Sequence, residues 1–273
     1  MSELPFRFFA LRVLRTAGVG ANFVRVTFGG PDLALLASGG RDQRFKLFLP
    51  HSGQDEPVMP DPSDPEWFTA WRALDPAVRG IMRTYTVRAL RRAGSEAAEL
   101  DVDFALHGDT VPASRWARAA RPGDRVTILG AVEEDNAGVD FRPPPGTDSI
   151  VLTADATALP AVAGILAWLP PELPAKVWIE IPHADDRREL PSRADTVVTW
   201  LIGDGAPPVL EAVRAAELPG SAPYAWIAGE SGTVKALRRH LVSERGIDRR
   251  AVTFTGYWKR GSSEDDLIAE VSA

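Results

Sequence analysis

The chain has 273 residues, of which 45% are hydrophobic and 25% charged, a balance typical of a folded globular protein large enough for two domains. It contains no cysteine, which excludes disulfides, thiolate nucleophiles and cysteine-ligated zinc or iron–sulfur clusters. The net charge of −6 argues against a protein that neutralises many nucleic-acid phosphates, so we expect no nucleic-acid partner. The four histidines are scattered without HxxxH spacing, so we expect no metal ligands.

No stretch approaches the roughly 20 apolar residues that a membrane-spanning helix needs. The N-terminus also lacks an apolar region followed by a small-residue cleavage site. The sequence therefore predicts no stable insertion into a membrane and a cytoplasmic location. We expect the chain to be a monomer.

Short alternating or β-branched runs fill the first half of the chain. FFALRVLR, NFVRVTF and RFKLFLP come first, separated by turn-forming residues. A Pro- and Asp-rich connection leads to a short helix expected early in EWFTAWRALDPAVRG, after which strands return in MRTYTVRAL, ELDVDFALHG and DRVTILGAV. This spacing predicts a small antiparallel barrel or sandwich.

The pattern changes after Gly146. Buried strands are predicted over SIVLTAD, KVWIEIP, DTVVTWLI, YAWIAGE and AVTFTGYW, and helices over TALPAVAGILAWLP, PPVLEAVRAA and TVKALRRHLVSER. Strands that alternate with helices indicate a mostly parallel sheet with helices on both faces. We therefore expect two domains, an antiparallel β-barrel over 1–145 and an α/β domain over 146–273.

The segment RTYT is the first candidate for ligand binding. Strand alternation sends Arg83 and Tyr85 to one face, where an exposed cation beside an aromatic ring suits a ligand with a diphosphate and a flat ring. An ordinary surface pair is the alternative. The segment resembles the Arg-x-Tyr-Thr/Ser strand of the ferredoxin–NADP reductase superfamily. That resemblance implies contacts with a flavin and its phosphates from Arg83, Thr84, Tyr85 and Thr86.

A longer segment, LHGDTVPASRWARAARPGDRV, suits a phosphate because a helix N-terminus with a proline in its first turn attracts anions. It resembles the siderophore-interacting protein family, FAD- and NAD(P)H-dependent ferric-siderophore reductases whose His-Gly-Asp-x-Gly-Pro-Ala-Ser-Arg-Trp-Ala stretch cradles the flavin diphosphate. The resemblance implies cofactor contacts from His107, Asp109, Pro112, Ala113, Ser114 and Trp116. Val111 replaces the family's usual Gly, so either the loop takes another path or the glycine is dispensable. A plain capped helix is the alternative.

Three further segments resemble the same family, in the same order along the chain. DQRFKLFLP is similar to a barrel strand that carries a basic residue, here Lys46, and implies a contact with the flavin or an anionic substrate. LTADATALPAV and AWIAGESGTVKALRRHL are similar to two turns that face the nicotinamide cofactor, although Ala154 and Ala156 replace a Gly and a Glu. They imply cofactor contacts from Asp155, Thr157, Ala158, Gly229 and Glu230. A solvated edge lysine and purely structural turns are the alternatives.

The segment TGYWKRG resembles the end of the family's final strand. It implies that Tyr257 and Trp258 lie near the flavin and that Lys259 and Arg260 attract an anionic chelate; a core tryptophan with solvated cations is the alternative. Earlier, IPHADDRREL follows a predicted strand where acidic residues bind a ribose hydroxyl and arginines bind its phosphate. Both residue types are present, so NADH and NADPH remain open.

Together these resemblances imply that 1–145 binds FAD and that 146–273 binds NADH or NADPH. The implied reaction passes a hydride from the nicotinamide to the flavin and then single electrons to Fe(III) held by a siderophore. No catalytic acid or base is required. The alternatives are a general flavin reductase or diaphorase with another acceptor, and a flavin- or siderophore-binding module without turnover.

Overall fold

The computed structural model describes residues 5–93, 97–106 and 111–262. Its contacts divide the chain into two compact units. Unit 1 comprises residues 1–19, 23–39 and 43–139, and unit 2 comprises residues 20–22, 40–42 and 140–273. The first half of the chain therefore lends two short segments to unit 2.

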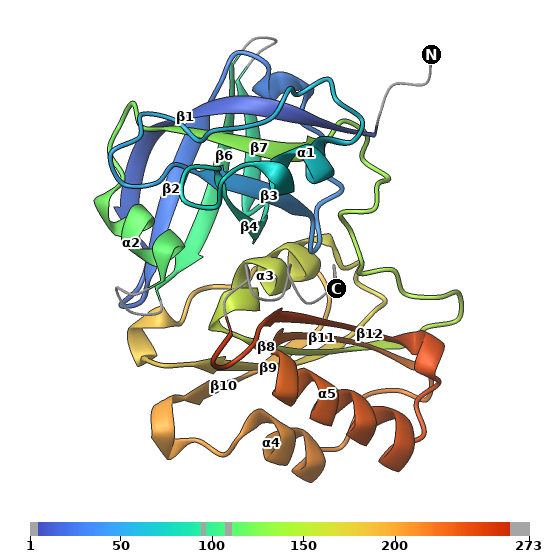
Figure 1. The fold of residues 1–273 in the computed structure, drawn as a ribbon. Helices are drawn as coiled ribbons and strands as arrows, with labels where there is room; N and C mark the ends of the chain where they lie inside the picture. Colours follow the sequence, from blue (N-terminus) through green and yellow to red (C-terminus); the bar gives the residue numbers. More distant parts are fainter. Residues whose placement is uncertain (1–4, 94–96, 107–110, 263–273) are drawn as a thin grey trace. The chain divides into compact units, whose positions relative to one another are not determined.

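Unit 1 is a seven-stranded antiparallel sheet in the order β4-β3-β7-β1-β2-β6-β5 (Figure 1). Its strands are β1 (Phe6–Gly18), β2 (Phe23–Gly29), β3 (Arg44–Leu49), β4 (Ile81–Thr86), β5 (Ala89–Ala93), β6 (Ala97–Ala105) and β7 (Arg125–Ala131). Two helices accompany them, α1 (Trp67–Ala73) and α2 (Pro112–Ala119). The predicted antiparallel β-barrel is confirmed as an antiparallel sheet that forms a half-barrel.

The run MRTYTVRAL differs from the expected single strand. It forms two strands because β4 pairs with β3 whereas β5 pairs with β6, at the opposite end of the strand order. The apolar faces of the strands enclose one core, which includes Phe9, Phe28 and Phe104. Ala113 and Ala117 of α2 are buried in the same core, which fixes that helix against the sheet.

Unit 2 is a five-stranded parallel sheet in the order β10-β9-β8-β11-β12. Its strands are β8 (Ser149–Asp155), β9 (Ala175–Ile181), β10 (Thr196–Ile202), β11 (Pro223–Glu230) and β12 (Val252–Trp258). The helices are α3 (Leu159–Trp168), α4 (Val209–Ala215) and α5 (Ser231–Arg239), with a π-helical turn over His240–Glu244. The predicted parallel sheet is confirmed.

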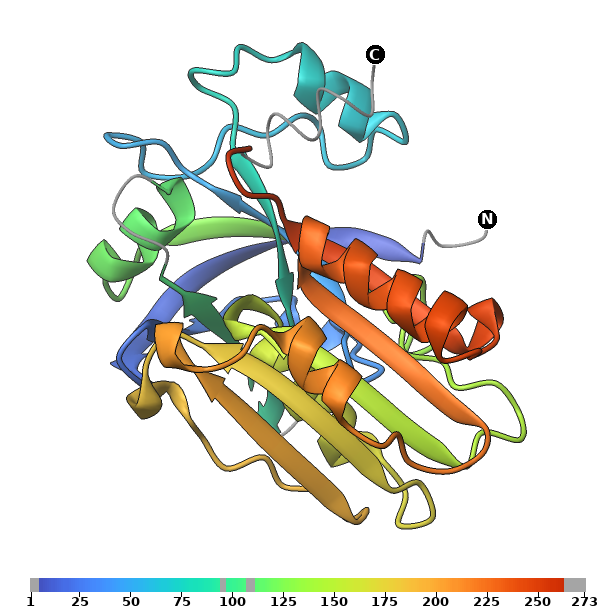
Figure 2. The ribbon, with the colours of Figure 1, turned by 90° about the horizontal axis from the view of Figure 1, so that it is seen from below.

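The helices of unit 2 cover both faces of its sheet. Figure 1 shows α3 on one face and α4 with α5 on the other, and Figure 2 shows the latter two across the same face. The chain changes faces because β9 and β10 lie to one side of β8 and β11 lies to the other. The carboxyl ends of β8 and β11 are thus the topological switch point, where open parallel sheets bind ligands.

Both borrowed segments are held in unit 2 by buried carboxylates. Asp42 is 2% exposed and accepts hydrogen bonds from the backbone N–H of Phe141 at 3.0 Å and the indole N–H of Trp226 at 2.9 Å. Burial raises the pKa of Asp42, although these hydrogen bonds oppose the shift. Asp186, fully buried, accepts from the backbone N–H and side-chain amide of Asn22, both at 2.8 Å.

No helix in the described parts of the chain is long and apolar enough to cross a membrane.

Candidate cofactor and substrate sites

In unit 1, β4 places Arg83 on the face that looks into the barrel. Its β3 neighbour Leu47 is fully buried, and Arg83 itself is only 8% exposed. Arg83 Nη1 donates to the backbone carbonyl of Met82 at 2.7 Å. The expectation of an exposed cation is therefore wrong, although Arg83 and Tyr85 do share a face as strand alternation requires. A buried guanidinium suits a ligand anion that enters the barrel better than it suits a solvated surface pair.

The outward face of the same strand pair carries the predicted substrate lysine. Lys46 lies opposite Thr84, and its ammonium donates to the Thr84 hydroxyl at 2.8 Å. Thr84 is exposed, whereas Thr86, on the same strand face, is buried. The side chains of Lys46 and Arg83 therefore lie on opposite faces of the sheet.

An aromatic row connects β4 with α2. The ring centroids of Tyr85 and Phe104 are 4.4 Å apart, and Phe104 and Trp116 are 5.8 Å apart. Trp116 also stacks against Phe28, with 12° between the ring planes. These contacts give Tyr85 and Trp116 fixed positions in the barrel wall. Trp116 therefore has a structural role, whether or not it also contacts a cofactor.

The start of α2 is a helix N-terminus without a described side-chain cap. Val111 precedes the helix at φ −80°, an ordinary value, so this position does not need the flexibility of a glycine. Pro112 follows in the first turn, and no described side chain caps the helix. Ala113 and Ser114 are buried, with the Ser114 hydroxyl 3.5 Å from the carbonyl of Ala105. His107 and Asp109 lie outside the described residues.

In unit 2, Asp155 ends β8 at the switch point. Its Oδ1 accepts from the backbone N–H and the hydroxyl of Thr157. Its Oδ2 accepts from the backbone N–H of Glu230 at 2.9 Å and from the indole N–H of Trp258 at 2.7 Å. An ionised carboxylate offers about four acceptor positions, so these four protein donors occupy them all. Asp155 therefore joins the ends of three strands rather than offering an acceptor to a ligand.

Gly229 makes this junction possible. Its φ is +141°, and a Cβ added there would lie 2.6 Å from Asp155 Oδ2. Only glycine adopts such a conformation readily, and only a missing side chain leaves room for the carboxylate. The predicted Gly229 is thus a packing requirement of the Asp155 junction.

Two glutamates cover helix N-termini beside this edge. Glu230 accepts from the Thr233 backbone N–H at 2.9 Å at the start of α5. Although burial alone would raise the pKa of Glu230, the backbone hydrogen bonds from Thr233 and Arg260 hold it below its ordinary value. Glu180 of β9 accepts from the Val209 N–H at 2.9 Å at the start of α4, and burial raises its pKa.

A pocket of about 340 Å³ lies between these two helix starts. Its lining includes Glu180, Leu210, Glu230 and Thr233. No motif distinguishes Glu180 in the sequence, although one signal points to it: it is the single acidic residue within the apolar strand KVWIEI.

The acidic and basic residues after β9 do not all remain available. The carboxylate of Asp186 accepts two hydrogen bonds from Asn22, whereas Asp185 and Arg187 are exposed. One of the two candidate carboxylates for a ribose hydroxyl, Asp186, is therefore buried in the fold. Asp185 is the remaining candidate for the ribose hydroxyl of NADH, and Arg187 with Arg188 for the ribose phosphate of NADPH.

The end of β12 carries the remaining predicted residues. Tyr257 makes an edge-to-face contact with buried Trp226, at 6.5 Å between ring centroids. Lys259 and Arg260 are exposed beyond the strand. Tyr257 and Trp258 are therefore held by contacts within unit 2, whereas Lys259 and Arg260 face solvent.

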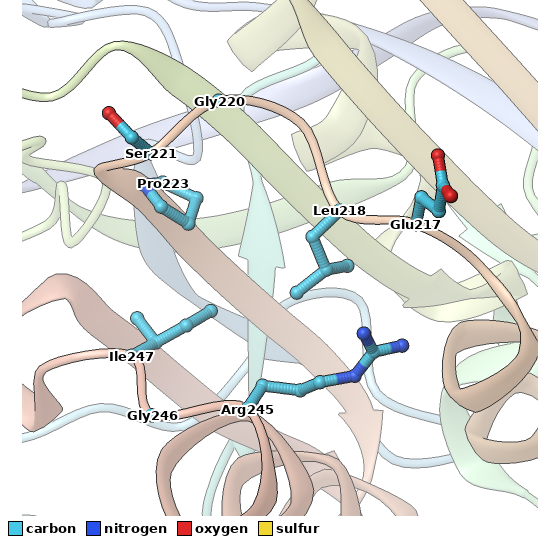
Figure 3. Close-up of a pocket in the computed structure, with 8 residues that line it drawn as sticks. All are labelled: Glu217, Leu218, Gly220, Ser221, Pro223, Arg245, Gly246 and Ile247. Carbon is cyan, nitrogen blue, oxygen red and sulfur yellow. The ribbon is translucent and has the colours of Figure 1, made fainter.

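The opposite, amino edge of the sheet also holds a carboxylate and a pocket. Asp148, just before β8, accepts from the backbone N–H and hydroxyl of Ser221 at 2.7 and 2.8 Å and from the Ala222 N–H at 3.0 Å. These bonds, the Ser221 backbone one foremost, lower the pKa of Asp148 to about 2. Figure 3 shows the adjoining pocket, about 470 Å³, between the loops 217–223 and 245–247.

Arg245 belongs to this pocket but is engaged by the fold. It donates to the carbonyls of Val213, Arg214 and Ala216 at the end of α4, and to His240 Nε2 at 3.3 Å. Such bonds satisfy helix carbonyls that have no partner within the helix. The amino edge is therefore a structural region, whereas the carboxyl edge has the topology of a ligand site.

The comparisons with known proteins agree with this architecture. Over 94% of this chain and 71% of the other, it superposes with a TM-score of 0.63 on the ferredoxin reductase of carbazole 1,9a-dioxygenase, at 14% identity. The two-unit fold is thus like that of this ferredoxin reductase.

Closer matches define the family. Residues 12–134 match the family model described as the siderophore-interacting FAD-binding domain, and residues 147–261 match the one described as siderophore-interacting protein. Ferric vibriobactin reductase ViuB of Vibrio cholerae serotype O1 is 30% identical over 260 residues, which cover 93% of this chain and 90% of ViuB. A siderophore utilization protein from T. fusca has 33% identity and a TM-score of 0.78 over 95% of each chain. The chain belongs to the siderophore-interacting protein family.

Proposed function

We propose that the chain is a ferric-siderophore reductase that uses FAD and a nicotinamide cofactor. One observation carries the proposal: both halves match this family in order, one with an FAD-binding model, and the similarity to a ferric vibriobactin reductase extends over nearly the whole chain. The predicted family resemblance is confirmed. The individual residue roles below are proposals.

The residues of unit 1 fit a flavin nucleotide. Arg83 brings a buried positive charge to the strand, and Tyr85 brings an aromatic ring on the same face. The start of α2 offers backbone N–H groups to a diphosphate, with Ser114 in its first turn. We assign Thr84, Thr86, His107 and Asp109 to the same cofactor from the resemblance.

In unit 2, we assign the nicotinamide diphosphate to the turn before α3 from the resemblance. The turn Ala156–Ala158 runs directly into α3 and is capped by Asp155, which accepts from the Thr157 N–H, as Glu180 and Glu230 accept N–H groups at the starts of α4 and α5. Thr157 and Ala158 lie directly before α3, in the turn after the first parallel strand. Phosphate binds at such helix starts because N–H groups and the helix dipole favour negative charge.

The reaction needs little chemistry from the chain itself. When bound, the two cofactors supply hydride transfer and single-electron transfer, so the protein binds and orients them and admits the iron chelate. We propose that Lys46, Lys259 and Arg260 attract the anionic ferric siderophore, since all three carry positive charge at the surface of their units. We propose a cytoplasmic monomer without a nucleic-acid partner.

Anaerobic reduction tests the function. Purified protein reconstituted with FAD should lose its yellow colour on addition of NADH or NADPH and regain it on addition of a ferric siderophore. Bleaching without recovery on any ferric chelate, but with recovery on a quinone, would indicate a general flavin reductase. A yellow protein inert to both nucleotides would overturn the reductase proposal.

Arg83→Ala tests the flavin site. The variant should bind FAD at least tenfold more weakly, because a buried charge-assisted contact to phosphate is lost. The matched control is Arg92→Ala, since Arg92 also donates to a backbone carbonyl of unit 1, that of Leu36 at 2.7 Å. The ratio of flavin to protein absorbance measures occupancy and circular dichroism checks the fold. Full occupancy in Arg83→Ala contradicts the assignment.

A further inference from the structure

Trp258 reaches across the end of a neighbouring strand. It ends β12, yet its indole N–H donates to Asp155 at the end of β8, and β11 lies between those two strands. Adjacent strands are about 4.8 Å apart, so the indole and the aspartate together bridge roughly 10 Å. The ring must therefore lie over the carboxyl end of β11, beside the switch point.

The same carboxylate also fixes the backbone beneath that ring. Asp155 Oδ2 receives the Glu230 N–H as well as the indole N–H, and Oδ1 holds Thr157 in the turn before α3. The Asp155 carboxylate thus fixes the positions of the Trp258 ring, the end of β11 and the turn before α3. The backbone of Trp258 is held separately, because the Ser231 hydroxyl donates to its carbonyl at 2.9 Å.

We propose that Asp155 is a positioning residue for the nicotinamide cofactor, acting through Trp258, Glu230 and Thr157 rather than by touching the cofactor. The proposal rests on the proposed function, since it needs a dinucleotide at this edge. Its four acceptor positions are filled by the protein, so a direct hydrogen bond to the cofactor would require one of these bonds to break. The Trp258 ring is the surface that Asp155 holds in place for the nicotinamide.

Asp155→Asn is the direct test, because asparagine has the same size. Its amide nitrogen must face either Thr157 or the N–H groups of Glu230 and Trp258, so one of these two sets of groups loses its acceptor, and the negative charge is lost for all of them. We expect the Kd for NAD⁺ or NADP⁺ and the KM of the reduced nucleotide to rise about tenfold, the loss expected for one charge-assisted hydrogen bond. The FAD content should stay unchanged, as should the reoxidation by ferric chelate of flavin reduced with dithionite.

Asp148→Asn is the matched control at the other end of β8. It removes a carboxylate that likewise accepts several hydrogen bonds, but at the amino edge. Its stability should fall while its nucleotide Kd and KM stay at wild-type values. Equal Kd values for Asp155→Asn, Asp148→Asn and wild type would overturn the proposal.

Trp258→Phe distinguishes positioning from direct contact. If Asp155 acts mainly through the indole, the effects of Asp155→Asn and Trp258→Phe on nucleotide Kd should be strongly non-additive. Additive effects would overturn the proposal in favour of a direct contact. The double variant Asp155→Asn/Trp258→Phe completes this cycle.

Indole NMR provides a readout that does not depend on turnover. The chain has eight tryptophans, and the Trp258 indole signal is the one missing from Trp258→Phe. It should move in Asp155→Asn and respond to NADP⁺ or NAD⁺ in the wild type; an unresponsive signal would overturn the proposal. If the nucleotide binds and perturbs this signal but never reduces the flavin, the proposed function fails and the positioning role stands. If neither nucleotide binds, both fail.

Discussion

The two ends of β8 carry similar carboxylates with different consequences. At the amino edge, Asp148 binds Ser221 and Ala222, which belong to a single turn before β11. At the carboxyl edge, Asp155 binds groups from the turn before α3, the end of β11 and the end of β12. The same hydrogen-bond chemistry closes one loop at one edge and unites three strand ends at the other. Only the second arrangement can transmit a change in one residue to the whole carboxyl edge of the sheet.

Each carboxylate is also pressed against a glycine with positive φ. A Cβ on Gly220, at φ +65°, would lie 2.2 Å from Asp148 Oδ1, and one on Gly229, at φ +141°, would lie 2.6 Å from Asp155 Oδ2. The left-handed region is accessible to other residues at some cost, whereas φ near +140° is almost restricted to glycine. The two edges therefore differ in how much change they tolerate.

The largest effect is expected from Gly229→Ala. We expect the free energy of unfolding to fall by about 3 kcal/mol and the KM for nicotinamide to rise at least tenfold, because the methyl group displaces Asp155. Gly220→Ala should also displace a carboxylate, that of Asp148, and cost about 2–3 kcal/mol, but leave KM unchanged. Urea unfolding and steady-state kinetics measure both. A KM change of equal size in Gly220→Ala would erase the distinction between the edges.

A smaller effect is expected when each carboxylate loses one hydroxyl donor. Thr157→Val and Ser221→Ala should each lower the free energy of unfolding by about 1 kcal/mol. Thr157→Val alone should raise the nicotinamide KM, by roughly two- to fivefold. Thr157→Ser keeps the hydroxyl and is the control. If Thr157→Ser behaves like Thr157→Val, the methyl group matters and the hydrogen bond to Asp155 does not.

The smallest effect concerns pH at the amino edge. The pKa of Asp148 is lowered from 3.8 to about 2 in the folded protein, so its contribution to stability is present above pH 3.8. That contribution is lost as the pH falls through about 2. The urea midpoint of wild type should therefore exceed that of Asp148→Asn at about pH 5 and approach it near pH 2. A gap that does not change with pH would contradict the shift. The effect is small because solvent screens a surface carboxylate.

Much of the fold could be predicted from the sequence because it depends on local periodicity. The antiparallel strands, the change to alternating strands and helices after Gly146, and the helix beginning at Pro112 all follow from nearby residues. The burial of Arg83 could not be predicted, because alternation gives the shared face of a strand but not which face meets the core.

The sequence indicates single residues of the candidate site but not the hydrogen bonds that join them, because those bonds connect distant parts of the chain. Family resemblance selected Asp155, Gly229, Glu230 and Trp258 individually, but it did not indicate that they bond to one another. Two of the four donors to Asp155 lie 75 and 103 residues further along the chain, at Glu230 and Trp258. The role of Glu180 could not be predicted, because it accepts a hydrogen bond from the backbone of Val209, which no side-chain motif indicates.

The contribution of Asp42 to unit 2 limits how the chain can be divided. A gene fragment that starts at Asp140 would encode all five parallel strands and their helices. It would lack the carboxylate that receives the Trp226 indole and the Phe141 amide, leaving two interior donors without an acceptor. A recombinant that takes only residues 140–273 from a relative would therefore fold poorly, unless residues 20–22 and 40–42 come from the same relative.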